Sequence, residues 1–194
     1  MLVEFAQVRL SAYAFPRGAR CFGRIPGAEP TYRRLTRHRL LSAAKCLVLQ
    51  GTAGLNASWQ NPADSKGHRV IPLPSEGFVR TAPMIASLIE QFGLQITDVV
   101  HPKLQSESEL VEKNYNVFHV EHALGSPFIP AQSDFVVPYG IASVVGFGGV
   151  LGSGDLYAAI LFSRVHVPSE SAKRFRSLAL TLRAVLFSLR AKKA

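Results

Sequence analysis

Cysteine is scarce in this sequence, which has only Cys21 and Cys46 among its 194 residues. Two thiols are too few for a disulfide framework and show no metal-ligand spacing, so a reducing compartment, the cytoplasm, is the expected location. Neither has the setting of a reactive thiolate, because Cys46 lies in a predicted core strand and Cys21 in an irregular N-terminal segment. Disulfide-rich scaffolds and cysteine-dependent enzymes are therefore not the expected classes.

Short catalytic signatures are also missing. The sequence has no phosphate-binding loop and no Gly-x-Ser-x-Gly turn. A glycine-rich run over residues 146–152 fails the spacing of a dinucleotide-binding loop, since a third glycine would have to fall at Leu151, and it lies inside a strand pattern. A bulge or a close approach of two backbones explains this run better. Because no nucleophile, base or metal set stands out, we expect a protein that is not an enzyme.

Long apolar segments are few. Only residues 135–162 suggest a membrane span, and Pro138, six glycines and a turn signal at 152–155 divide that window into pieces too short to cross as helices. The N-terminus, with Glu4 close to its start, does not read as a secretory signal. We therefore expect neither membrane insertion nor secretion.

Acidic residues are scarce at the two ends, where the positive charge behind the net charge of +9 is concentrated. Residues 1–40 have eight arginines and two glutamates, and residues 173–194 have seven basic residues and no acid. Residues 41–172 have seven basic and eleven acidic residues, so the body of the chain is acidic. Neither end interleaves aromatic with basic residues as a nucleic-acid stacking surface does, so nucleic acid is not the expected partner.

The patterning predicts one globular domain over residues 39–190. It is preceded by a basic, disordered or loosely ordered tail over residues 1–38, which shows no sustained period, and it is followed by a short tail at 191–194. Strands are expected over residues 44–50, 70–73, 114–120, 141–151 and 156–167, with loops over 51–67, 105–113 and 121–132. A helix is expected between an N-cap at Thr81 and Gly93, and a last helix from an N-cap at Ser169 to about Arg190.

Two features of the last predicted elements call for extra contacts. The strand from Leu156 is apolar on both faces, so each face of the sheet needs a cover. The apolar stripe of the last helix is wider than one sheet contact requires, which favours a second helix or a partner subunit. The residues expected to form this dimer or signalling face are Phe175, Leu178, Leu182, Val185, Leu186 and Leu189.

A metal site was considered at His119 and His122, with Glu121 between them and His101 as a third ligand. Residues i and i+3 at a strand end do not share a face, and no further cysteine or carboxylate completes a coordination shell. A structural or surface role is therefore favoured and no metal is expected. Elemental analysis after dialysis decides between the two.

The order of elements resembles the GAF family of sensor domains. The segment PYGIASVV at residues 138–145 is similar to the family's "y-G-I-r-S-v-l" strand, and residues 154–162 are similar to its "g-g-x-l-x-G-v-l-x-l" strand. Residues 163–185 resemble the closing strand, proline-acidic turn and "L-A-x-x-l-a-x-A-L" helix. The chain lacks the chromophore cysteine of phytochrome-type members and the redox cysteines of methionine sulfoxide reductase members, so neither activity is carried over, and the cofactor stays unknown.

The resemblance implies a GAF-like α+β fold. Its central antiparallel sheet would have about five to six strands, with helices on one face and a loop-covered pocket on the other. Such domains work with histidine kinases, diguanylate cyclases or transcription regulators and pair through terminal helices, as in two-component systems. The resemblance thus implies a cytoplasmic sensor that binds a small molecule and signals through its last helix as a homodimer; the alternative is a ligand-free dimerisation or protein-interaction module.

Residues that combine ring surface with some polar tips near the less regular face are the expected lining of the pocket. Trp59 stands alone in a polar loop, where it either caps the core or closes the ligand site. The candidate ligand-binding residues are Trp59, Phe118, His119, Phe135, Tyr139 and Phe147.

Overall fold

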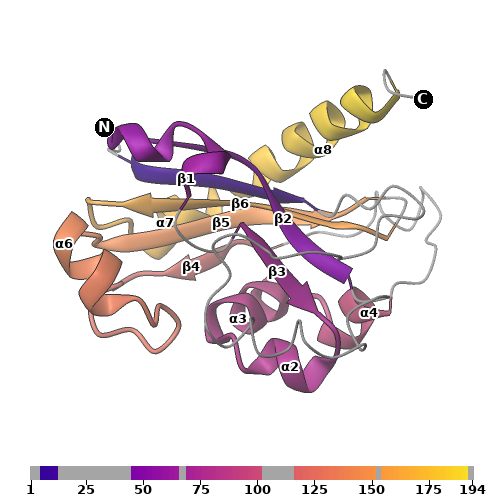
Figure 1. The fold of residues 1–194 in the computed structure, drawn as a ribbon, viewed down its shortest axis with the longest axis horizontal. Coiled ribbons are helices and arrows are strands. Elements are labelled where there is room, and N and C mark those ends of the chain that lie inside the picture. The colour runs from indigo at the N-terminus through magenta and orange to yellow at the C-terminus, as the bar shows by residue number, and fades with distance from the viewer. Residues whose placement is uncertain (1–4, 13–44, 66–68, 102–115, 152–153, 192–194) are drawn as a thin grey trace.

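The computed structural model describes residues 5–12, 45–65, 69–101, 116–151 and 154–191. Within these ranges the fold is mixed α+β with antiparallel strand pairing, as the sequence predicts (Figure 1). The strands are β1 (Phe5–Ala12), β2 (Lys45–Gly54), β3 (Val70–Leu73), β4 (Phe118–Val120), β5 (Ser143–Val150) and β6 (Leu156–Ser163). Cys21 and the expected loop at 105–113 lie outside the described residues.

The strands form two antiparallel groups that β1 joins. One group is β2 with β3, and the other is β4, β5 and β6. β1 pairs with both β2 and β6, which gives the order β3-β2-β1-β6-β5-β4. β3 and β4 are thus the edge strands, while the likeness of this sheet to a GAF sheet stays a prediction.

β1 corrects the expectation that residues 1–38 contain only a tail without regular structure. Its sequence, FAQVRLSA, alternates polar Gln7, Arg9 and Ser11 with apolar neighbours, the period of a strand. The alternating pattern covers only eight residues, and the strands that pair with it, β2 and β6, lie far along the chain. Because the sequence around it is irregular, the pattern alone does not predict a strand. The other residues of that segment lie outside the described ranges.

Helices lie on both sides of the sheet in the described ranges, in contrast to the expected single helical face. α2 (Glu76–Arg80), α3 (Pro83–Gln91) and α4 (Ile96–Val100) lie on one side, and α8 (Arg176–Ala191), preceded by α7 (Ser169–Lys173), lies on the other (Figure 1). Short turns η2 (Ala57–Trp59), η3 (Pro62–Asp64), η4 (Gln132–Val136) and α6 (Val137–Tyr139) complete the described elements. The two-faced apolar pattern of β6 required both covers.

The larger core lies between the sheet and the α2–α4 side. It contains fully buried Phe92 just after α3, Phe118 of β4 and Leu156 of β6, together with buried residues of the 121–142 segment. Trp59, Phe135 and Tyr139 pack against it from η2, η4 and α6. Helices and irregular segments therefore share this face, where the sequence predicted a pocket under loops alone.

The smaller core lies under α7 and α8. Tyr157, which is fully buried, donates its hydroxyl to the carbonyl of Ala179 at 3.0 Å and so ties β6 to the first turn of α8. Phe147 and Leu161 pack with Ala179 on the same side. This polar tether gives α8 a defined register on the sheet, because a buried phenol without a partner is costly.

The glycines of β5 allow two strands and a helix to come close together. A Cβ atom on Gly148 would lie 2.1 Å from the Tyr157 carbonyl oxygen, and one on Gly146 would lie 3.1 Å from Phe118. The run lies inside a strand, with no helix directly after it. The structural interpretation of this glycine run, a close backbone approach, is therefore confirmed.

Several boundaries differ from the sequence-based prediction. β2 extends through residues 51–54, which were expected to be loop, and α2, α4 and the turns over 132–139 were not predicted. Thr81 ends α2, donating its hydroxyl to the Phe78 carbonyl, and α3 begins at Pro83 after Ala82. These elements are about one turn to two turns long, so periodicity has too few residues to identify them.

The last helix is divided. A turn at Arg174 and Phe175, where both backbone N–H groups donate to the carbonyl three residues earlier, separates α7 from α8. α7 begins at Ser169, so Pro168 rather than Ser169 occupies the capping position. No glycine or proline marks the division, which explains why the sequence predicted one helix. No helix in the described ranges combines the length and apolar character that a bilayer crossing needs.

Candidate functional site

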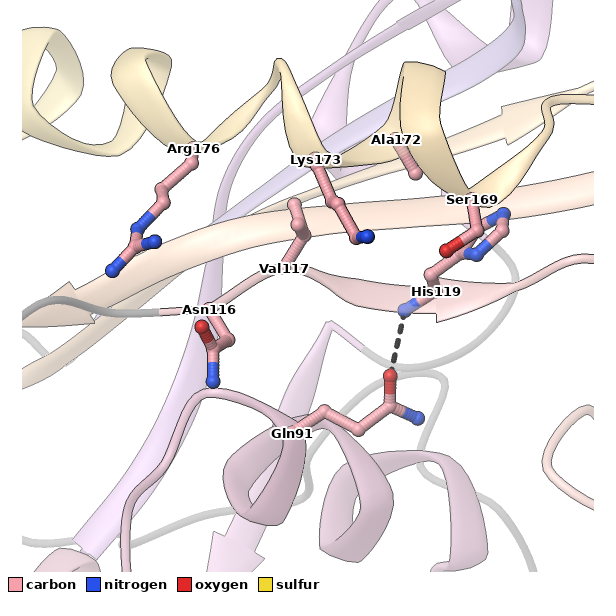
Figure 2. A pocket seen from close by; sticks show the side chains of 8 residues that line it. All are labelled: Gln91, Asn116, Val117, His119, Ser169, Ala172, Lys173 and Arg176. Atoms are coloured by element: carbon pink, nitrogen blue, oxygen red, sulfur yellow. Dashed lines mark hydrogen bonds between the residues drawn. The ribbon is translucent and has the colours of Figure 1, made fainter.

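A groove of about 490 Å³ runs between edge strand β4 and the α7–α8 junction (Figure 2). α3 contributes its last residue, and the chain just before β4 contributes two more. Figure 2 shows Lys173 and Arg176 pointing from the helices toward β4. The lining residues are Gln91, Asn116, Val117, His119, Ser169, Ala172, Lys173 and Arg176.

The floor of the groove is held by two hydrogen bonds of His119. Its backbone N–H, at the outer edge of β4, donates to the Gln91 side-chain oxygen at 2.8 Å. Its ring Nε2 lies 2.9 Å from the Val167 carbonyl oxygen, which only accepts, so Nε2 carries the proton. Gln91 in turn donates to the Ser87 hydroxyl at 2.9 Å. His119 is therefore a structural link between β4, α3 and the segment before α7.

The groove is electropositive on its helical side. Lys173 pairs with Glu170 at 2.5 Å, and this hydrogen bond and charge lower the pKa of the Glu170 carboxyl. Arg176 begins α8, which has no acidic residue in its first turn. A cation at the positive end of a helix dipole is unfavourable by itself. An anion placed between Arg176 and the helix N-terminus would offset both positive charges.

Four of the predicted ligand-binding residues lie on the opposite side of the sheet from this groove. Trp59, Phe135 and Tyr139 form an aromatic cluster, with ring centroids 4.5 Å apart for Trp59 and Tyr139 and 5.9 Å for Trp59 and Phe135. Phe135 also meets the Phe162 ring edge to face, with centroids 4.9 Å apart. Phe118 is fully buried in the same core. These rings pack on each other, and Trp59, Phe135 and Tyr139 also pack against the larger core; whether Trp59 closes a ligand site stays a prediction.

The remaining two predicted residues lie on the α7–α8 side. His119 lines the groove, and Phe147 packs under α8 with its ring centroid 6.2 Å from that of Phe175. Strand alternation separates His119 from Phe118, because neighbouring residues of a strand point to opposite faces. The six residues therefore do not form one site.

The predicted signalling face of the last helix divides into two. Phe175, Leu182 and Leu186 pack on the sheet, whereas Leu178 and Val185 are 43% and 49% exposed. The side chain of Leu189 lies outside what the structure describes. Leu178 and Val185 are seven residues apart and so lie on one exposed face of α8.

The histidines predicted near β4 occupy separate places. His101 ends α4, exposed, and His119 is engaged as described above. His122 stacks instead on His166, and the ligand atoms of Glu121, His122 and His166 all lie within 4.8 Å of one another. A carboxylate and a second imidazole thus do join His122, in contrast to the expectation from the sequence, where residue 166 is too distant to be associated with it.

Of the residues that line the groove, the sequence predicted only His119 as a site residue; the polar side chains of Gln91, Asn116, Lys173 and Arg176 are among those it missed. The sequence carries no clear signal for them, because the helix predicted from Ser169 has acidic Glu170 in its first turn and only the division before Arg176 places a basic residue at a helix start. Their meeting with β4 depends on tertiary packing. Comparison of the chain with models of protein families, with curated proteins and with solved structures finds no match. The expectations drawn from the GAF resemblance stay predictions, and so does the absence of enzyme activity that was expected from the lack of a catalytic signature.

Proposed function

We propose that this protein is a cytoplasmic sensory regulatory domain that binds a small anionic molecule in the β4–α8 groove. Binding changes the position of α8 and so reaches a partner of the histidine kinase, cyclase or transcription-regulator type. The observation that carries the proposal is that the residues lining one side of the groove belong to the α7–α8 junction. A ligand that contacts this junction interacts directly with the helix that would transmit the signal.

The charge and donors of the groove support an anion rather than an apolar ligand. Arg176 forms no ion pair with an acidic side chain in the part of the chain that the structure describes. A guanidinium binds a carboxylate or phosphate through two parallel hydrogen bonds. The Asn116 amide and the partly paired Lys173 supply further donors across the groove.

The exposed face of α8 supports transmission to another chain. Leu178 and Val185 lie within the same helix that Arg176 begins. The Tyr157 hydroxyl holds α8 on the sheet. A ligand at the N-terminus of α8 would therefore shift the helix relative to this fixed contact. Differential affinity of the ligand for two positions of α8 is sufficient to shift their populations. A ligand-free dimerisation module is the alternative that the same exposed face supports.

The test is binding of named anions to the full chain. Inorganic phosphate, succinate, citrate and adenosine nucleotides are screened by thermal shift and then measured by calorimetry. We expect at least one to stabilise the protein, and Arg176→Gln to weaken its affinity about tenfold or more, since a hydrogen bond to a charged group contributes about 1.5–3 kcal/mol. Hydrogen exchange of α8 amides is expected to slow when that anion binds.

Arg174→Gln is the matched control, because Arg174 is an exposed neighbour that does not line the groove. It removes the same charge and should leave the affinity within about twofold, the range expected of a screened surface charge. Equal losses of anion affinity in Arg176→Gln and Arg174→Gln would indicate a nonspecific charge effect and would contradict binding in the groove. Absence of stabilisation by every probe at millimolar concentration would favour the ligand-free module.

A further inference from the structure

We propose that Glu121, His122 and His166 form a binding site for a divalent transition-metal ion, with zinc as the best match. One potential ligand atom from each residue lies within 4.8 Å of the others. Glu121 Oε1 and His166 Nε2 are 3.2 Å apart, and the rings of His122 and His166 are stacked with centroids 5.2 Å apart and planes at 23°. The site is separate from the anion groove and does not depend on the proposed function.

The ligand set determines the class of ion. Two imidazoles and one carboxylate are the protein ligands of a zinc site that leaves its fourth position to water, with bonds of about 2.0–2.2 Å. Ligand atoms in a tetrahedral shell of that size are about 3.4 Å apart, close to the present Glu121–His166 separation. Magnesium and calcium require mainly oxygen ligands and do not fit two imidazoles. The same donors accept copper, which forms stronger complexes with most such sites.

The backbone around the three ligands is held in place by one buried hydroxyl. Ser143, which is fully buried in β5, donates to the Glu121 carbonyl at 2.8 Å and accepts from the Val167 N–H at 2.9 Å. The two chain segments that contribute the ligands are therefore fixed at one distance before any ion binds. Such preorganisation reduces the entropy lost on binding.

The ligand side chains are accessible although their backbone is fixed. The Glu121 and His166 side chains are 42% and 48% exposed, so an ion can enter from solvent and small rotations can bring the three atoms together. As a solvent-exposed ion pair alone, Glu121 with His166 would contribute little to stability. A bound ion would cross-link the end of β4 to the segment leading into α7.

Zinc binding is measured by calorimetry on the full chain after removal of any affinity tag and of bound metal with a chelator. We expect one Zn²⁺ per chain, a higher melting temperature with Zn²⁺, and no response to Mg²⁺. His122→Asn and His166→Asn should each weaken Zn²⁺ affinity by at least about tenfold, the size of effect that even an outer-shell partner has. With Co²⁺, the visible absorption of a site with nitrogen ligands should appear in the parent chain and be lost in both variants.

His101→Asn is the matched control, since His101 is exposed and lies outside the cluster. It should leave the affinity and the Co²⁺ spectrum unchanged. Both ligand variants alter exposed side chains, and circular dichroism checks that their fold is retained. Failure to bind Zn²⁺ at millimolar concentration would overturn the proposal, and so would binding that persists in His122→Asn and His166→Asn.

Discussion

Replacing Gly148 by alanine would place a methyl group where β5, β6 and α3 come closest. The new Cβ would lie 2.1 Å from the Tyr157 carbonyl oxygen and 2.8 Å from both Ala158 Cα and Phe92 Cε2. Carbon contacts are optimal at about 3.5–4.0 Å, so each distance must grow by at least about 0.7 Å. Two of the three obstacles are backbone atoms, and Gly148 and Ala158 are partners in the β5–β6 pairing. Strands that separate lose hydrogen bonds, so relaxation is costly.

Overpacking in a core typically lowers the free energy of unfolding by about 1–3 kcal/mol. Because two of the obstructing atoms belong to the backbone, Gly148→Ala should lower it by about 3 kcal/mol or more. For a domain of this size each kcal/mol lowers the melting temperature by about 2–4 °C, so a fall of about 6–12 °C is expected. Circular dichroism during heating and urea unfolding measure both quantities.

Gly77→Ala is the control, because no atom lies within 4 Å of a Cβ there and Gly77 lies within helix α2. It should stabilise the protein by about 0.4–1 kcal/mol through the unfolded state. In Gly146→Ala the new Cβ would lie 3.1 Å from the Phe118 side chain. The change in stability of this variant should therefore lie between those of Gly77→Ala and Gly148→Ala. A folded Gly148→Ala variant that melts within about 2 °C of the parent would refute the close approach of β5 and β6, since that shift corresponds to less than about 1 kcal/mol.

Two further predictions concern Ser143 and the exposed face of α8. Ser143→Ala leaves one backbone N–H and one carbonyl without their hydroxyl partner, so urea unfolding should show a free energy of unfolding lower by about 1–3 kcal/mol. An unchanged urea midpoint would contradict the role of the Ser143 hydroxyl as a link between Glu121 and Val167. Leu178→Gln combined with Val185→Gln should leave monomer stability within about 0.5 kcal/mol, as for ordinary surface changes. Light scattering should show loss of the dimer, and a parent chain that is monomeric at every concentration would contradict the dimer face.

Long elements with a clear period were predictable from the sequence. β5 and β6 are eight residues each and apolar, the sequence between them carries the turn signal Gly-Ser-Gly-Asp, and their pairing follows from proximity in the chain. α3 was identified from its apolar period and the proline at its start. The burial of Cys46 and the packing role of the glycine run were also expected correctly. In each case the deciding contacts are local or the side-chain pattern is unambiguous.

The candidate site could not be predicted in the same way. Both the groove and the metal cluster bring together residues that are distant in sequence, such as Gln91 with His119 and Glu121 with His166. Ring surface with polar tips near irregular segments predicts the aromatic candidates, but this property does not distinguish a ring that lines a cavity from one that fills the core. Strand alternation could have separated Phe118 from His119, but only the order of the sheet shows which face each element covers.

By itself, the sequence determined where the long strands and helices lie, because apolar period and turn chemistry are local properties; the α+β fold with an antiparallel sheet was what the resemblance to the GAF family implied. The tertiary structure alone decided that β1 joins the two strand groups, that helices cover both faces, and that α8 begins beside an edge strand. These arrangements depend on which apolar faces bury each other across long stretches of chain. The free energy of that burial arises between faces that are distant in sequence, so no local sequence pattern predicts these arrangements.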